Sequence, residues 1–116
     1  MSDSVTKKQT VNDFTIILEP GNRLDNNNAH FMVDTIGQAQ SDGYTYILID
    51  MTELEFISSA GVGAILGTIE TSRENGGDII IYKASENILR ALQALDLLDY
   101  LTIKDTREAA LELAVK

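Results

Sequence analysis

The segment from Ile47 to Gly63 constrains the fold of this chain more than any other. It begins with Ile47-Leu48-Ile49, an uninterrupted aliphatic run that ends at Asp50 and is typical of a strand buried on both faces. After a short polar link, a run of small residues leads into apolar positions with helical spacing at 62, 65, 66 and 69. A buried strand followed closely by a helix, which begins at about residues 59–60, predicts an α/β fold.

The same alternation of strand and helix continues along the rest of the chain. Apolar runs predict strands at residues 14–18, 44–50, 78–82 and 101–103, and the mostly polar residues 5–11 predict a weak edge strand. Helical spacing and end signals predict helices at residues 29–41, at about 60–75, just after Ser85, and from about 105 to 115. Strands separated by helices imply parallel neighbours, whereas the first two strands form an antiparallel hairpin. We therefore predict one domain, residues 1–116, with a single mixed, mostly parallel β-sheet packed by about four helices.

Polar residues near the predicted helix ends supply capping signals. Asn26-Asn27-Asn28 precede the first helix, and Asp42-Gly43 follow it. Asp105 and Glu108 have the spacing of a capping box for the last helix. Before the second helix, the apolar pair Phe56-Ile57 is expected to anchor the preceding loop to the core.

The composition limits the classes of partner. The formal net charge is −9, from 18 acidic and 9 basic residues. Nucleic-acid binding requires clustered Lys and Arg, and an anionic membrane repels an acidic protein, so we expect neither partner. An acidic surface suits a basic protein partner, or it serves solubility alone. The absence of cysteine excludes disulfides, thiolate metal sites and a cysteine nucleophile.

Targeting and metal signals are missing from the sequence as well. No apolar run approaches the roughly 18 residues that a membrane helix needs, and the N-terminal residues lack the charged and apolar regions of a signal peptide. We therefore expect a cytoplasmic protein without a cofactor. His30 is the one histidine, and because no second ligand candidate stands at a fitting spacing, we expect it on a helix surface rather than on a metal.

Two neighbouring serines, Ser58 and Ser59, stand at the predicted start of the second helix. A serine is a favoured N-cap because its oxygen accepts a hydrogen bond from an amide of the first turn, and capping alone would explain both residues. The same helix end carries partial positive charge and unpaired N–H groups, so it would also tolerate a phosphoryl group. The small residues and glycines that follow leave backbone that another protein can approach closely.

This stretch resembles the phosphorylation loop of bacterial anti-sigma factor antagonists, the small STAS-domain proteins. The family pattern is roughly Asp-Ser-(Ser/Thr/Ala)-Gly-(Leu/Val/Ile)-Gly after a hydrophobic strand. Ser59 matches the phosphorylated serine, Ala60 the small variable position, and Gly61, Val62 and Gly63 the remainder. Ser58 stands where the family usually has aspartate. The resemblance covers nearly the whole chain and implies the STAS fold.

The resemblance implies a regulator that switches partners. Residues 58–63 would bind an anti-sigma factor that is also a serine-protein kinase, phosphorylation of Ser59 would release it, and a serine phosphatase would restore binding. The segment from Gly21 to Asp25 matches the family's Gly-x-Leu-Asp with one extra residue, which implies that Asp25 lies in an acidic pocket beside the phosphoserine. A turn aspartate that precedes a helix explains Asp25 equally well. Asp50 is expected to add to these acidic surroundings.

Other functions fit parts of the sequence. A scaffold module, or a partner switch outside transcription, is consistent with Ser58 in place of aspartate. Some STAS relatives are thought to sense nucleotides, so weak nucleotide binding is a further alternative. Enzyme activity is not expected, because the chain lacks Gly-x-Gly-x-x-Gly, a Walker loop and Gly-x-Ser-x-Gly, and its sole histidine stands on another element than Ser59.

Overall fold

The computed structural model describes residues 5–115, so the N-terminal segment considered for a signal peptide lies outside the described residues. Its strands and helices follow in this order: β1 (Val5–Asn12), β2 (Thr15–Pro20), β3 (Arg23–Leu24), α1 (Ala29–Ser41), β4 (Tyr46–Asp50), β5 (Phe56–Ile57), α2 (Ser59–Glu74), β6 (Asp78–Tyr82), α3 (Glu86–Ala94), β7 (Thr102–Lys104) and α4 (Arg107–Leu113). The predicted order of the longer elements is confirmed.

Five strands form the main sheet in the order β1-β2-β4-β6-β7. β1 runs antiparallel to β2, and the remaining neighbours are parallel, as the helical crossovers between them require. The mixed, mostly parallel sheet is therefore confirmed. The two short strands β3 and β5 pair separately, in parallel, and form a second small sheet that the sequence did not predict. A two-residue strand is too short to produce a periodic signal.

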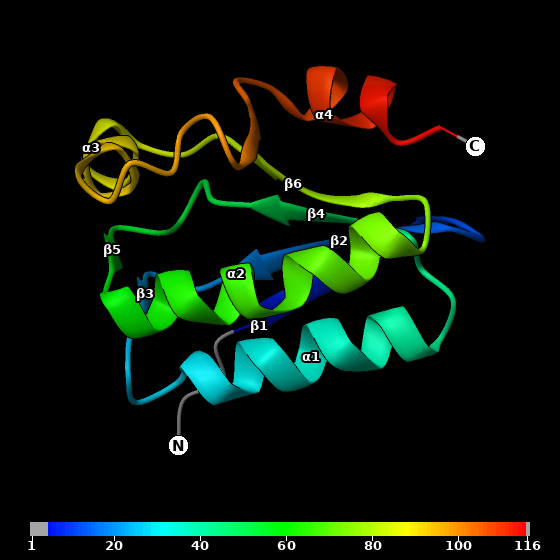
Figure 1. The fold of residues 1–116 in the computed structure, drawn as a ribbon, viewed down its shortest axis with the longest axis horizontal. Coiled ribbons are helices and arrows are strands. Elements are labelled where there is room, and N and C mark those ends of the chain that lie inside the picture. Colours follow the sequence, from blue (N-terminus) through cyan, green and yellow to red (C-terminus); the bar gives the residue numbers. More distant parts are fainter. Residues whose placement is uncertain (1–4, 116) are drawn as a thin grey trace.

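The main sheet has a core on each face. Residues of α1, α2 and α3 pack against Ile47, Ile49, Ile79 and Ile81 on one face, where α1 and α2 lie side by side (Figure 1). Alternate residues of the same strands form a smaller cluster with Ala110 and Ala114 near α4 on the other face. The three aliphatic residues of β4 are each 0% exposed, which confirms the predicted strand buried on both faces.

Two predicted capping signals differ from the structure. α4 is capped by Thr106, whose Oγ1 accepts a hydrogen bond from the Ala109 amide at 3.1 Å, and not by a box of Asp105 and Glu108. Asn28 occupies the N-cap of α1, but its side chain makes no capping bond. Its amide group instead holds the preceding turn, with Oδ1 accepting from the Asp25 amide and Nδ2 donating to the Arg23 carbonyl, each at 2.9 Å.

Gly77 closes the connection between α2 and β6 where two backbone segments touch. A Cβ at this position would collide with the Thr45 carbonyl oxygen, which accepts the Asp78 amide at 3.1 Å. Gly67 on α2 differs, because a Cβ there would meet no atom within 4 Å. The fold therefore requires the glycine at 77 and not at 67.

We expect Gly77→Ala to lower the free energy of unfolding by about 1–3 kcal/mol, because the new methyl group must displace backbone. Gly67→Ala is the matched control and should raise it by about 0.5–1 kcal/mol through its greater helix propensity. Urea unfolding of both variants measures the difference. Equal destabilisation by the two substitutions would contradict the close approach at Gly77.

Candidate functional site

The candidate site is the start of α2, and Ser58 is its N-cap. The Ser58 backbone is extended, and its Oγ accepts a hydrogen bond from the Gly61 amide at 3.3 Å. The Ser58 carbonyl accepts from the Val62 amide at 2.9 Å, so the helix starts at the next residue. Ser58 therefore has the capping role, in the place where the family pattern has aspartate, which is also a favoured N-cap.

Ser59 is the first residue of α2, and its side chain is exposed. Within residues 5–115, no hydrogen bond occupies its hydroxyl group. The explanation that Ser59 is only a helix cap is therefore wrong, because its neighbour does the capping. An exposed hydroxyl at the positive end of a 16-residue helix is accessible to another protein and lies where a negative charge is tolerated.

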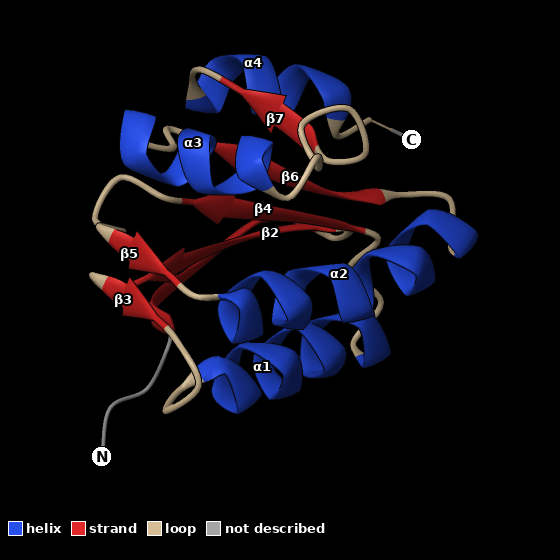
Figure 2. Ribbon diagram, turned by 60° about the vertical axis from the view of Figure 1, so that its left-hand side comes forward, coloured by secondary structure: helices blue, strands red, loops and turns tan. Residues whose placement is uncertain are grey.

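The small sheet of β3 and β5 holds this helix start in place. Arg23 pairs with Phe56 and Leu24 with Ile57, and the Leu24 carbonyl accepts a hydrogen bond from the Ser58 amide at 2.9 Å. Figure 2 shows β3 beside β5, with α2 starting directly after β5. A Cβ on Gly61 would lie 2.5 Å from the same Leu24 oxygen, so only glycine permits this approach of helix and strand.

The six residues 58–63 do not form one continuous exposed surface. Ser59, Ala60 and Gly63 are exposed, and Ser58 is half-buried. Gly61 and Val62 are buried, with Val62 only 4% exposed. The expectation that all six contact a partner is therefore wrong in part, because the helical spacing turns Gly61 and Val62 towards the core and leaves the other side of the turn to solvent.

Asp25 directly follows β3, in the turn before α1, and is 8% exposed. Its Oδ1 accepts from the Asn27 amide at 3.0 Å, and its Oδ2 pairs with the Arg23 guanidinium at 3.2 Å. The structure thus gives Asp25 the role of a turn aspartate, which was one of the two interpretations. Its position directly after Leu24 keeps it close to the Ser58 backbone, but the carboxylate is already paired.

Asp50 faces a different region from α2. It ends β4, and side chains alternate along a strand, so Asp50 projects on the same side as Leu48, the side of the α4 cluster. Its Oδ2 accepts from the Tyr82 hydroxyl at 3.1 Å, and its Oδ1 accepts from the Thr52 amide at 2.9 Å. The expectation that Asp50 adds to the surroundings of Ser59 is therefore wrong, because the side chains of β4 alternate between the two faces of the sheet.

An arginine and an aromatic ring beside the site were missed from the sequence. The Arg23 guanidinium lies 4.4 Å from the centre of the Phe56 ring, and 43% of Phe56 is exposed. Of the predicted anchor pair, only Ile57 is buried, at 7% exposure. The signal that could have identified this pair is the alternation within a strand, because only one of two successive residues can face the core.

The profile of one protein family, described as the STAS domain, matches residues 5–110 of the chain. The chain belongs to the STAS domain family. This STAS domain is 28% identical over 101 residues to a Thermotoga maritima protein with the provisional name of anti-sigma factor antagonist, covering 86% of this chain and 89% of that protein. An anti-sigma-B factor antagonist of Listeria monocytogenes is 26% identical over 57 residues, which is 49% of this chain and 50% of the relative.

Solved structures share the architecture of this STAS domain. A crystal structure of the Thermotoga maritima protein superposes with a TM-score of 0.85 at 26% identity, covering 93% of this chain and 92% of that one. The unphosphorylated form of the anti-sigma factor antagonist SpoIIAA superposes with a TM-score of 0.72 at 22% identity, covering 91% of this chain and 94% of that one. The phosphorylated form of SpoIIAA from Bacillus superposes with a TM-score of 0.70 at 22% identity, covering 91% of this chain and 96% of that one. The SpoIIAA matches establish the likeness of the fold.

No helix of the STAS domain within residues 5–115 is long and apolar enough to cross a membrane.

We expect Ser58→Ala to lower the free energy of unfolding by about 0.5–2 kcal/mol, because the N-cap bond to Gly61 is lost. Ser59→Ala removes a hydroxyl that makes no bond within the described chain, so it should change stability by less than about 0.5 kcal/mol. Chemical denaturation of the two variants makes the comparison. If Ser59→Ala were the more destabilising, the division of roles between the serines would be incorrect.

The pKa of Asp50 is lowered although burial alone would raise it, because hydrogen bonds from Thr52 and Tyr82 stabilise the carboxylate. A carboxyl group with a lowered folded pKa contributes stability above its unfolded pKa, about 3.9, and loses it as the pH falls through the folded pKa. The wild-type protein should therefore lose more stability than Asp50→Asn below about pH 4. Urea unfolding over this range, with the exposed Asp99→Asn as control, measures the difference. An unchanged pH slope in Asp50→Asn would contradict the assignment.

Proposed function

We propose that the first turn of α2 is a protein-binding surface controlled by phosphorylation of Ser59. The observation that carries the proposal is the division of roles between the two serines. Because Ser58 caps the helix, Ser59 has a free, exposed hydroxyl on a turn that the β3–β5 pair holds in position. A kinase can then modify Ser59 without removing a bond that the fold requires.

The partner in the unphosphorylated state is an anti-sigma factor that is also a serine-protein kinase, and a serine phosphatase reverses the modification. The family and the names of its members support this assignment, because the relatives are named anti-sigma factor antagonists. SpoIIAA, which has the same fold, exists in an unphosphorylated and a phosphorylated form. With such partners, the protein acts in the cytoplasm and has a regulatory rather than an enzymatic role.

Electrostatics would make such a modification an effective switch. A phosphoserine adds about −1.5 to −2 charge at pH 7, in a chain whose formal net charge is already −9. The N-terminus of α2 offsets part of the internal cost, by about 0.3–1 kcal/mol at an exposed position. The fold should therefore tolerate the phosphoryl group, whereas a partner that must approach Ala60 and Gly63 closely is repelled and sterically blocked.

Phosphorylation of the wild-type protein by its cognate kinase should be lost in Ser59→Ala and retained in Ser58→Ala, because, of these two serines, Ser59 is the one with an exposed and free hydroxyl. Ser59→Asp should bind the same kinase at least about tenfold more weakly than wild type, a difference of about 1.4 kcal/mol. Radiolabel incorporation and calorimetry measure the two effects.

Ser58→Ala serves as the matched control for the loss of a neighbouring hydroxyl, provided that its unfolding curve shows it to be folded. Persistent labelling of Ser59→Ala would assign the acceptor to another residue. Unchanged kinase binding by Ser59→Asp, together with normal labelling of the wild type, would leave Ser59 modified without a switching role.

A further inference from the structure

A second site lies on the opposite face of the main sheet, away from Ser59. A groove of about 420 Å³ opens between β1, β2, β4 and the start of α4. Its walls are mostly charged or polar side chains: Lys7, Lys8, Gln9, Glu19, Asp50 and Arg107, with Ile17 as the apolar member. The volume is within the range of small-molecule sites, about 300–1,000 Å³.

Strand register brings the charged residues together. Lys7 stands opposite Glu19 in the β1–β2 pair, and Leu18 is level with Ile49 in the β2–β4 pair. Glu19 and Asp50, the next residue on each of these parallel strands, therefore lie side by side at the carboxyl ends of the strands. This edge is where open α/β sheets bind ligands. The Ile17 side chain, 4% exposed, forms the floor beneath them.

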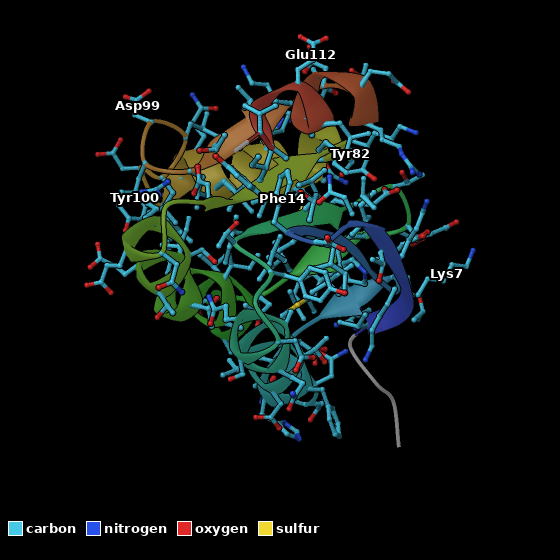
Figure 3. The ribbon with its side chains drawn as sticks, turned by 90° about the vertical axis from the view of Figure 1, so that its right-hand side faces the viewer. Lys7, Phe14, Tyr82, Asp99, Tyr100 and Glu112 are labelled. Carbon is cyan, nitrogen blue, oxygen red and sulfur yellow. The ribbon has the colours of Figure 1, made fainter. Side chains whose placement is uncertain are left out.

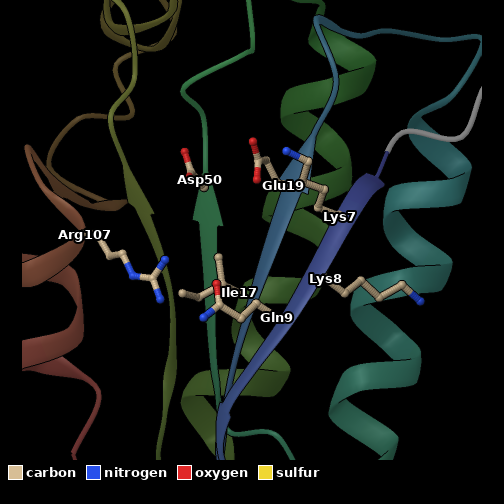
Figure 4. Close-up of a pocket in the computed structure, with 7 residues that line it drawn as sticks. All are labelled: Lys7, Lys8, Gln9, Ile17, Glu19, Asp50 and Arg107. Atoms are coloured by element: carbon tan, nitrogen blue, oxygen red, sulfur yellow. The ribbon is translucent and has the colours of Figure 1, made fainter.

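Arg107 differs from the other three arginines of the chain. Arg23, Arg73 and Arg90 each form an ion pair with a carboxylate. Arg107 is half-buried, yet its guanidinium makes no hydrogen bond or ion pair within residues 5–115. In Figure 4 it extends from α4 across the groove towards Gln9 and Ile17, while Lys8 points away. A half-buried guanidinium with free donors that faces a cavity is suited to bind a carboxylate.

Two carboxylates line the groove, and only that of Glu19 is without a side-chain partner among the described residues. Glu19 forms no ion pair with any described residue, although Figure 4 shows its carboxylate next to the Lys7 ammonium. Asp50 is held by Tyr82 and Thr52 in a fixed orientation. Figure 3 shows Lys7 projecting from β1, with Tyr82 nearer to α4.

We propose that this groove binds a small zwitterionic ligand with an ammonium group at one end of a carbon chain and a carboxylate at the other, such as an ω-amino acid. The ligand carboxylate pairs with the Arg107 guanidinium and accepts from the Gln9 side-chain amide. Its ammonium group lies between the Glu19 and Asp50 carboxylates. The carbon chain between the two groups rests on Ile17.

The charges of the lining disfavour ligands that carry a single charge. Of the residues that face inwards, Lys7 and Arg107 are positive and Glu19 and Asp50 are negative, so their charges balance. A plain anion would be repelled by the two carboxylates, and a plain cation by the two basic groups. Only a ligand that carries both charges can pair at each end without leaving one end of the groove uncompensated.

The test is a titration of the full-length protein followed by amide chemical shifts in nuclear magnetic resonance. The probes are ε-aminocaproate, caproate and n-hexylamine, which share a six-carbon chain and carry both charges, the negative charge or the positive charge alone. We expect ε-aminocaproate at millimolar concentration to shift the amides of Gln9, Ile17 and Arg107. Caproate and n-hexylamine should each bind at least about tenfold more weakly, because one charge-assisted pair is missing.

Arg107→Gln and Glu19→Gln should each weaken ε-aminocaproate binding by about tenfold. Arg90→Gln, on the exposed part of α3, is the matched control and should leave the affinity unchanged. Equal affinity for caproate and ε-aminocaproate, wild-type affinity in Arg107→Gln, or no shifts at the groove with any probe would each overturn the proposal. The outcome is independent of Ser59, since none of these residues belongs to the start of α2.

Discussion

The hydrogen bond from the Ser58 amide to the Leu24 carbonyl is the contact on which the candidate site depends. It joins two loops that each connect a strand of the main sheet to a helix, at 2.9 Å, and the β3–β5 pair extends the same contact. Gly61 lets the first turn of α2 approach this carbonyl, because any Cβ would collide with it. The position of Ser59 is thus set by backbone contacts, and its own side chain remains free.

The two faces of the sheet have separate roles in this arrangement. The larger core, with α1, α2 and α3, supports the loop that presents Ser59. The smaller core lies near α4, and polar side chains of β1, β2 and β4 continue that face as a groove. Because residues alternate along each strand, neighbouring positions serve different surfaces. Asp50 therefore belongs to the groove, although it stands only nine positions before Ser59 in the sequence.

Ser58 shows how a departure from a family pattern can preserve a structural role. Aspartate and serine both accept a hydrogen bond from an amide in the first turn of a helix. Serine, however, brings no negative charge next to Ser59. If Ser59 is phosphorylated as proposed, its immediate surroundings are less acidic than the family pattern would make them. Arg23, stacked on the exposed Phe56, adds a positive group on the adjacent strand.

The sequence by itself determined the α/β class, the order of the longer elements and the helix start at the paired serines. These features follow from local signals: aliphatic runs of strand length, apolar residues at helical spacing, and small residues at a turn. Only the tertiary structure decided which serine caps the helix, that β3 and β5 pair, that Asp25 is held by Arg23, and that Asp50 faces away from α2. The first three depend on side-chain and backbone contacts that leave no periodic trace in the sequence. The direction of Asp50 follows from alternation along β4, but only the folded chain shows which face of the sheet carries α2.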